Sequence, residues 1–175
     1  RNLAENGYNN AFYQLVEYVN QTEVMLAKST ISNSAKHGAE TLTNVWKDAT
    51  LAQSYLARLP IGSQELENTQ KFLNQVAEYS YSLANKAING NELTQEELDN
   101  LTSLCNYSKD LKNTLNQLEV DLYSGNIKWG ELEKKGGNVL EQEASNLSQS
   151  SFGSMEEGLN QYAGLIYDGA YSNHM

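Results

Sequence analysis

The stretch TQEELDNLTSLCNYSKDLKNTLNQLEVDLYSGN, residues 94–126, decides the fold class of this chain. It opens on Thr94 and Glu97, the capping-box pattern in which each side chain satisfies a backbone N–H group at the start of a helix. Apolar residues then recur at alternating steps of three and four, which places them on one face of an α-helix. They are Leu101, Leu104, Leu111, Leu115, Leu118 and Leu122, with Ser108 in the same register. Because Gly125-Asn126 is a helix stop, the stretch predicts one long amphipathic helix.

The same spacing predicts three earlier helices. The first covers residues 2–28 and carries an apolar seam of Tyr8, Phe12, Leu15 and Val19. The second begins at a cap on Asn33 or Ser34 and ends at Leu59, because a proline at position 60 disfavours helical geometry before it. Its apolar face is rich in alanine, with Trp46 as the large anchor. The third covers residues 64–87 and stops at Asn89-Gly90-Asn91.

Residues beyond Gly125 carry a weaker pattern. Residues 127–147 predict a fifth, shorter helix, which Gly136-Gly137 weakens. Residues 148–175 read as a serine-rich linker, a short helix and an extended tail. Short turns between long helices favour antiparallel neighbours, so the sequence predicts an all-α, antiparallel up-down bundle of four long helices over residues 1–147, with the fifth helix and tail added.

Charge excludes several functions. The 22 acidic and 12 basic residues give a net charge of −10, whereas nucleic-acid binding needs a basic stripe. The same charge disfavours adhesion to anionic lipid. No run approaches the roughly 20 apolar residues of a membrane span. The chain begins at Arg1, inside a helical pattern, and we interpret it as a fragment whose upstream part has been removed.

No residue pattern predicts catalysis, a cofactor or a metal ion. His37 and Glu40 stand alone in the sequence, and we interpret them as a solvated helix start rather than a ligand set. The thiol of Cys105, beside the leucine seam, is interpreted as core packing. The pairs Glu96-Glu97 and Glu156-Glu157 fit a solvated face better than an acid/base pair, because nothing fixes their separation.

The aromatic residues are the best candidates for partner contact. Eleven tyrosines against three phenylalanines suit half-buried or interfacial positions. Tyr79-Ser80-Tyr81 must point to different sides of its helix, so at least one of these tyrosines should lie outside the core. Trp129 follows a turn and lies off any strong seam. Tyr79, Tyr81 and Trp129 are therefore candidate partner contacts, although structural packing is the more common role for such residues.

Several separated blocks resemble the amino-terminal region of the YpeB family of spore germination proteins. These blocks keep the order and spacing of the family along nearly the whole chain. They are residues 4–12 (AENGYNNAF), 45–47 (VWK) with Leu59-Pro60, 72–76 (FLNQV) with 79–81 (YSY), 126–129 (NIKW) and 165–174 (LIYDGAYSNH). Lys47 and Ala170 depart from the arginine and proline expected at those two positions.

The resemblance implies a membrane anchor upstream of this region and PepSY domains downstream, with 148–175 as the junction. It also implies that the protein lies on the cortex side of the spore inner membrane, where the family is needed for retention of the cortex-lytic enzyme SleB. That enzyme is the expected partner, with the PepSY domains or self-association as further possibilities. The family offers no catalytic residues to carry over.

Three hypotheses follow from the sequence. The leading one is a non-catalytic interaction domain that stabilises or controls the lytic enzyme. The alternative is an extracytoplasmic ligand-sensing four-helix domain, which needs a pocket with convergent polar groups between its helices. A hydrolase acting by itself is the third.

Overall fold

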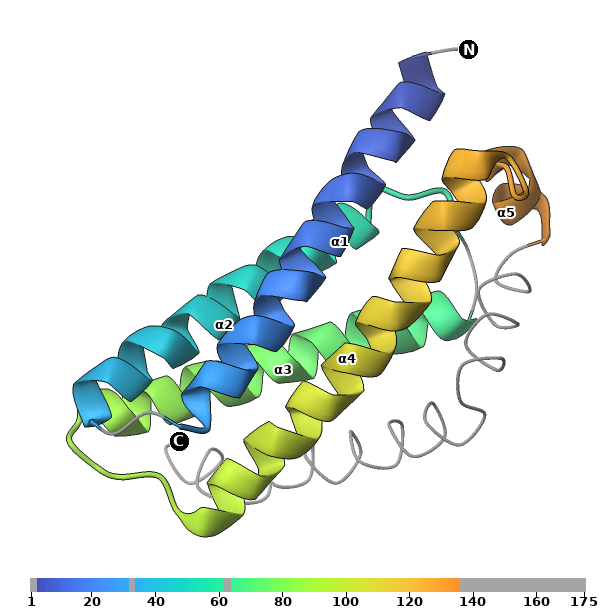
Figure 1. Ribbon diagram of the computed structural model, residues 1–175. Helices are drawn as coiled ribbons and strands as arrows, with labels where there is room; N and C mark the ends of the chain where they lie inside the picture. Colours follow the sequence, from blue (N-terminus) through green and yellow to red (C-terminus); the bar gives the residue numbers. More distant parts are fainter. Residues whose placement is uncertain (1–2, 32–33, 62–63, 136–175) are drawn as a thin grey trace.

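The computed structural model describes residues 3–31, 34–61 and 64–135 (Figure 1). These residues form five helices and no strand, which confirms the predicted all-α class over the described ranges. The helices are α1 Leu3–Ser29, α2 Ala35–Leu56, α3 Gln64–Ile88, α4 Gln95–Ser124 and α5 Trp129–Lys135. The four long helices run alternately in opposite directions, as the short turns between them predict.

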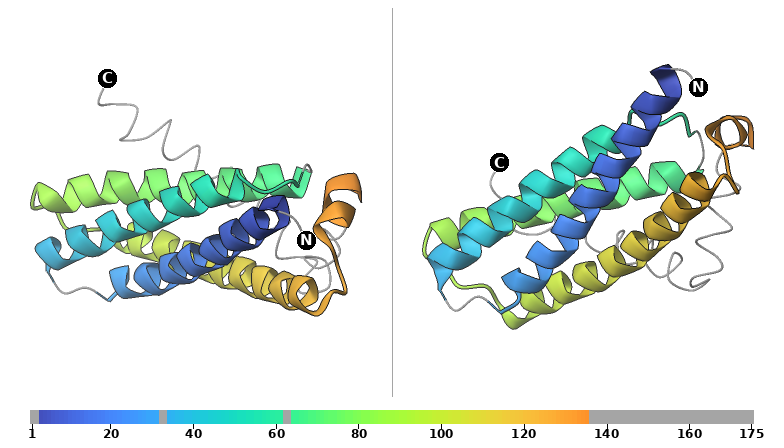
Figure 2. Two further views of the ribbon diagram at one scale, coloured as in Figure 1. Left: turned by 90° about the horizontal axis from the view of Figure 1, so that it is seen from above. Right: turned by 45° about the horizontal axis from the view of Figure 1, so that its top comes forward.

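The long helices do not approach one another equally. Helix α1 packs against α2 and α4, and α2 packs against α3 (Figure 2). Helices α3 and α4 approach each other less closely and are linked by side chains. The rings of Phe72 and Tyr107 lie 6.5 Å apart edge to face, and the Nδ2 of Asn100 donates a hydrogen bond of 3.0 Å to the hydroxyl of Tyr79.

The core follows the predicted seams. Its largest fully buried side chains come from all five helices, so the seams meet in one cluster. These residues are Leu15, Val19 and Leu26 on α1, Leu42 and Val45 on α2, Phe72 and Leu73 on α3, Leu101, Leu104 and Leu118 on α4, and Leu132 on α5. Burying each such side chain contributes about 1.5–3 kcal/mol, which is why the apolar stripe sets the rotation of each helix.

Local chemistry fixes the α3–α4 connection residue by residue. Gly90 takes a φ of 85°, and the N–H of Asn91 donates to the carbonyl of Lys86, which closes α3 with a Schellman motif. Four residues later, Thr94 and Glu97 form the predicted capping box of α4. The Oε1 atom of Glu97 accepts from the Thr94 N–H at 2.8 Å and from the Lys86 ammonium at 2.7 Å, so one carboxylate ties both helix ends together.

Two expectations for α2 need correction. The helix ends at Leu56 rather than Leu59, because residues 57–59 turn before Pro60, although Leu59 remains buried. Trp46 is not the anchor of the apolar face, since 40% of its surface is exposed. Val45, one position earlier, is fully buried in its place. Ser34 is the N-cap, with its Oγ accepting from the His37 N–H at 3.1 Å.

The predicted fifth helix is present in part. Its described portion is α5, which begins after Lys128 and contains the buried residues Trp129 and Leu132. The rest of that helix, residues 136–147, and the tail assigned to residues 148–175 lie outside the described residues. The domain boundary at residue 147 therefore stays a prediction.

Candidate functional site

The three aromatic residues singled out in the sequence occupy different environments. Tyr79 is buried, and its hydroxyl accepts the hydrogen bond from Asn100 of α4. Trp129 is also buried, whereas 46% of the surface of Tyr81 is exposed. The prediction that Tyr79 and Tyr81 face different sides of their helix is thus confirmed. Contact with a partner stays a prediction, and of these three residues only Tyr81 presents its ring at the surface.

Trp129 joins α5 to the beginning of α1. Its Nε1 donates a 2.7 Å hydrogen bond to the Oδ1 of Asn9. Its ring lies 5.7 Å from that of Tyr8 and 5.9 Å from that of Phe12, the latter edge to face. Aromatic pairs in such tilted geometries contribute about 0.5–1.5 kcal/mol beyond the area they bury. Trp129 therefore acts as a structural anchor between segments distant in sequence.

Tyr81 contacts Trp46 of the neighbouring helix α2, a residue that the sequence assigned to the core. Its ring lies 5.3 Å from the ring of Trp46, with the two planes tilted by 45°. Both rings are partly exposed, so the pair forms an aromatic surface over the α2–α3 seam. Large exposed aromatic side chains are enriched where proteins bind one another.

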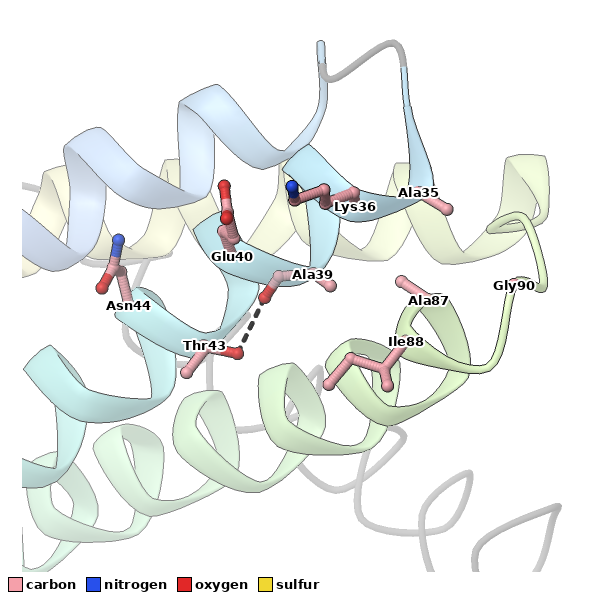
Figure 3. A pocket seen from close by; sticks show the side chains of 9 residues that line it. All are labelled: Ala35, Lys36, Ala39, Glu40, Thr43, Asn44, Ala87, Ile88 and Gly90. Carbon is pink, nitrogen blue, oxygen red and sulfur yellow. Dashed lines mark hydrogen bonds between the residues drawn. The ribbon is translucent and has the colours of Figure 1, made fainter.

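A hollow of about 770 Å³ lies on the same two helices, between the start of α2 and the end of α3 (Figure 3). Ala39 and Thr43 line it from α2, and Ala87 and Ile88 line it from α3. Lys36, at the start of α2, stands with Glu40 at its rim. Ile88, at the end of α3, is 65% exposed and adds apolar surface to the hollow.

Acidic side chains are unevenly distributed between helix α4 and the segments that carry the aromatic pair and the hollow. Residues 35–47 and 81–90, which carry the aromatic pair and the hollow, contain three lysines and one glutamate. Helix α4 instead contains six acidic residues and two lysines. Lys86 is paired with Glu97 of α4, so these two segments together are close to neutral in a chain whose net charge is −10.

Helices α1 and α4 also carry large exposed apolar side chains. They are Tyr13, Val120 and Tyr123, whose exposed fractions are 53%, 58% and 94%, and we refer to these three residues together as the α1–α4 face. The two helices pack together, and the contact between Asn9 and Trp129 places the start of α1 near the end of α4. The sequence carries no signal for these positions, because a tyrosine on a helix can be buried or exposed.

The remaining chemical candidates are structural. The Sγ of Cys105 lies 3.6 Å from the carbonyl oxygen of Glu23, whose carboxylate pairs with Lys112 at 3.1 Å. Burial raises the pKa of the Cys105 thiol, and the nearby Glu23 carboxylate raises it further, which disfavours a nucleophilic thiolate. The prediction that Cys105 is a core residue is confirmed.

The structure describes the surroundings of several of the carboxylate and histidine candidates. His37 and Glu40 are exposed, as expected of a solvated helix start. Glu96 is exposed, and Glu97 serves the capping box. Glu156-Glu157 lie outside the described residues. Within the ranges that the structure describes, no group of three or more histidine, cysteine or acidic side chains is arranged to hold a metal ion.

The described helices also bear on membrane insertion. None of those in residues 3–31, 34–61 and 64–135 combines the length and apolar character needed to cross a bilayer.

The fold and its exposed aromatic surfaces define the class of this protein, an all-α antiparallel bundle domain. The family model described as YpeB N-terminal matches residues 1–131, and the chain belongs to this family. It is 30% identical over 132 residues to the sporulation protein YpeB of Halalkalibacterium halodurans, covering 75% of this chain and 30% of that protein. It is 24% identical over 160 residues to the sporulation protein YpeB of Bacillus subtilis, covering 91% of this chain and 35% of that protein.

The chain thus spans about a third of the length of these relatives. No solved structure matches it significantly. The comparisons confirm the family resemblance seen in the sequence, and both relatives are named sporulation proteins.

Proposed function

We propose that this bundle is a non-catalytic binding domain that helps to hold or restrain the cortex-lytic enzyme SleB in the spore. Membership in the YpeB N-terminal family is the observation that carries the proposal, because its named relatives are sporulation proteins. In the full-length protein, the domain would lie on the cortex side of the spore inner membrane, attached through an upstream anchor.

The α1–α4 face supports this role and is the proposed contact surface for the enzyme. Tyr13, Val120 and Tyr123 expose apolar and aromatic area beside the acidic side chains of α4. A partner surface with apolar pockets and surrounding basic residues would match both features. Electrostatic attraction to such a partner would raise the association rate and weaken with added salt.

Capture of purified SleB by this chain tests the proposal. The immobilised chain should retain the enzyme, and Tyr123→Ala or Val120→Glu should reduce the captured amount. Tyr81→Ala, on the opposite pair of helices, is the matched control. Capture by a fragment that contains only the PepSY domains, with none by this chain, would refute the proposal.

The absence of catalysis is part of the same proposal. Incubated alone on cortex peptidoglycan in a zymogram, the chain should produce no clearing. Clearing that disappears on substitution of a single carboxylate would show that the chain is a hydrolase.

Ligand sensing is a second candidate, supported by a smaller hollow of about 350 Å³ at the end of the bundle where α2 begins. Leu42, Leu93 and Leu98 line it together with the polar residues Ser34 and Asn91. Its volume falls at the lower end of the range of small-molecule sites. A thermal-unfolding screen with amino acids, nucleosides and sugars tests this candidate, and a raised Tm abolished by Leu93→Trp would support it.

A further inference from the structure

The aromatic pair and the hollow lie along one face of the α2–α3 hairpin. Thr43 lines the hollow and precedes Trp46 by three residues, less than one helical turn. On α3, Tyr81 and Ile88 are seven residues apart, which corresponds to about 10 Å along the helix axis. The partly exposed pair of rings therefore lies toward one end of this face. The hollow, lined by Ala39, Thr43 and Ala87 with Lys36 and Glu40 at its rim, lies toward the other.

We propose that this face binds a second copy of the same chain. A twofold axis between α2 and α3 would reverse the direction of the face in the second copy. Trp46 and Tyr81 of each copy would then enter the hollow of the other copy. Such an arrangement is isologous, because each copy contributes the same projection and the same recess.

The lining of the hollow suits aromatic rings. Ala39 and Ala87 present only methyl groups, so a ring can approach the helix backbones closely. Ile88 adds apolar surface that is 65% exposed in the single chain. Buried aromatic anchors surrounded by complementary small side chains are typical of the residues that dominate binding energy.

Charge favours this face over the rest of the surface. Two chains of net charge −10 repel each other, most strongly where the acidic helix α4 would meet its copy. The α2–α3 face avoids that encounter because its two segments contain a single glutamate and are close to neutral once Lys86 is paired with Glu97. The twofold arrangement also brings Lys47, next to Trp46 in each copy, to the end of the other copy's face where Glu40 stands. Each dimer would thus contain two opposite-charge pairings across the interface.

The size of the face sets the expected affinity. Parts of two helices provide a small interface, at the lower end of the range for specific complexes. We therefore expect a reversible dimer that forms at micromolar concentrations and dissociates on dilution.

Sedimentation velocity over a range of concentrations tests the dimer. Ile88→Glu should raise the dissociation constant at least about tenfold, because a hot-spot position would become charged. Val120→Glu is the matched control, since it introduces the same charge at a position that is 58% exposed on α4. A chain that stays monomeric at about millimolar concentration would overturn the proposal. Equal effects of the two substitutions would also overturn it.

Charge reversal tests the twofold geometry separately. Glu40→Lys and Lys47→Glu should each weaken the dimer, and the double variant should recover the parental dissociation constant. Both substituted residues are exposed, and far-UV circular dichroism of each variant checks that the helices are intact. A double variant that remains as weak as the single variants would refute the arrangement. The result is independent of SleB binding, because the proposed enzyme contact uses the α1–α4 face.

Discussion

Replacing Trp129 by alanine should loosen the end of the bundle where α5 packs against the start of α1. The substitution removes a buried indole, its 2.7 Å hydrogen bond to Asn9 and its ring contacts with Tyr8 and Phe12. Truncating a buried tryptophan costs about 3–5 kcal/mol. The loss at this position is limited to the free energy that docks α5, because this short helix can detach while the four long helices remain packed.

Trp129→Phe separates the hydrogen bond from the packing. Phenylalanine keeps apolar area against Tyr8 and Phe12 but removes the indole N–H. Asn9 is exposed, so water can replace the lost donor. We therefore expect a smaller loss of about 1 kcal/mol. Tyr123→Ala, at a ring that is 94% exposed, should change the free energy of unfolding by less than about 0.5 kcal/mol.

Urea unfolding followed by far-UV circular dichroism measures these differences, and amide hydrogen exchange locates them. Exchange should accelerate in α5 and in the first turns of α1 but not at the α3–α4 connection. An alanine variant within about 0.5 kcal/mol of the parent, with unchanged exchange in α5, would refute the anchoring role.

Three further predictions concern the interior and the helix ends. Burial raises the pKa of the Asp48 carboxyl, and the adjacent Lys47 only partly opposes this shift, so the parent protein should lose stability as the pH rises through the titration of that carboxyl. Asp48→Asn should remove this loss. In urea unfolding, the gain in the free energy of unfolding of the variant over the parent should be larger at pH 7 than at pH 4. Thr94→Ala should lower the free energy of unfolding by about 1 kcal/mol, because the N-cap of α4 is lost. Glu97→Gln should lower it by less than about 1 kcal/mol, because the ion pair of Glu97 with Lys86 is partly exposed. Equal losses of stability in thermal unfolding would contradict this difference. Cys105 should react with iodoacetamide about a hundredfold more slowly in the folded chain than in urea, and equal rates would show that the thiol is accessible.

The sequence predicted the helix ends that are set by capping residues and by glycines with a positive φ. Helix α4 begins and ends where Thr94, Glu97 and Gly125 require, because capping hydrogen bonds and a positive φ are decided within a few residues. The end of α3 at Gly90 followed for the same reason. Such signals do not depend on what the helix packs against.

The position of Trp46 shows where periodicity fails. Adjacent residues on a helix differ by about 100° in direction, so both Val45 and Trp46 fit a spacing of three and four. Val45 lies in the core and Trp46 at the surface, because the contacts of α2 with α1 and α3 set the rotation of α2 about its axis. The partner helices determine this choice, and the sequence of α2 alone does not contain it.

The candidate surfaces were predicted only in part. The sequence singled out Tyr81, but its pairing with Trp46 requires two helices to be brought together. Trp129 lay off any seam because its contacts are with α1, about 120 residues earlier in the chain. The greater separation of α3 and α4 also had no sequence signal, since both helices carry regular apolar stripes.

The amount of SleB retained in dormant spores tests the central claim most directly. Spores would carry the full-length protein with Val120→Glu and Tyr123→Ala on the α1–α4 face, and immunoblots would measure both proteins. We predict a reduced level of the lytic enzyme while the full-length variant accumulates normally, with Ile88→Glu spores as the control for charge on the opposite side. A parental level of the enzyme in the double-variant spores would contradict the claim that this face of the helical domain holds it.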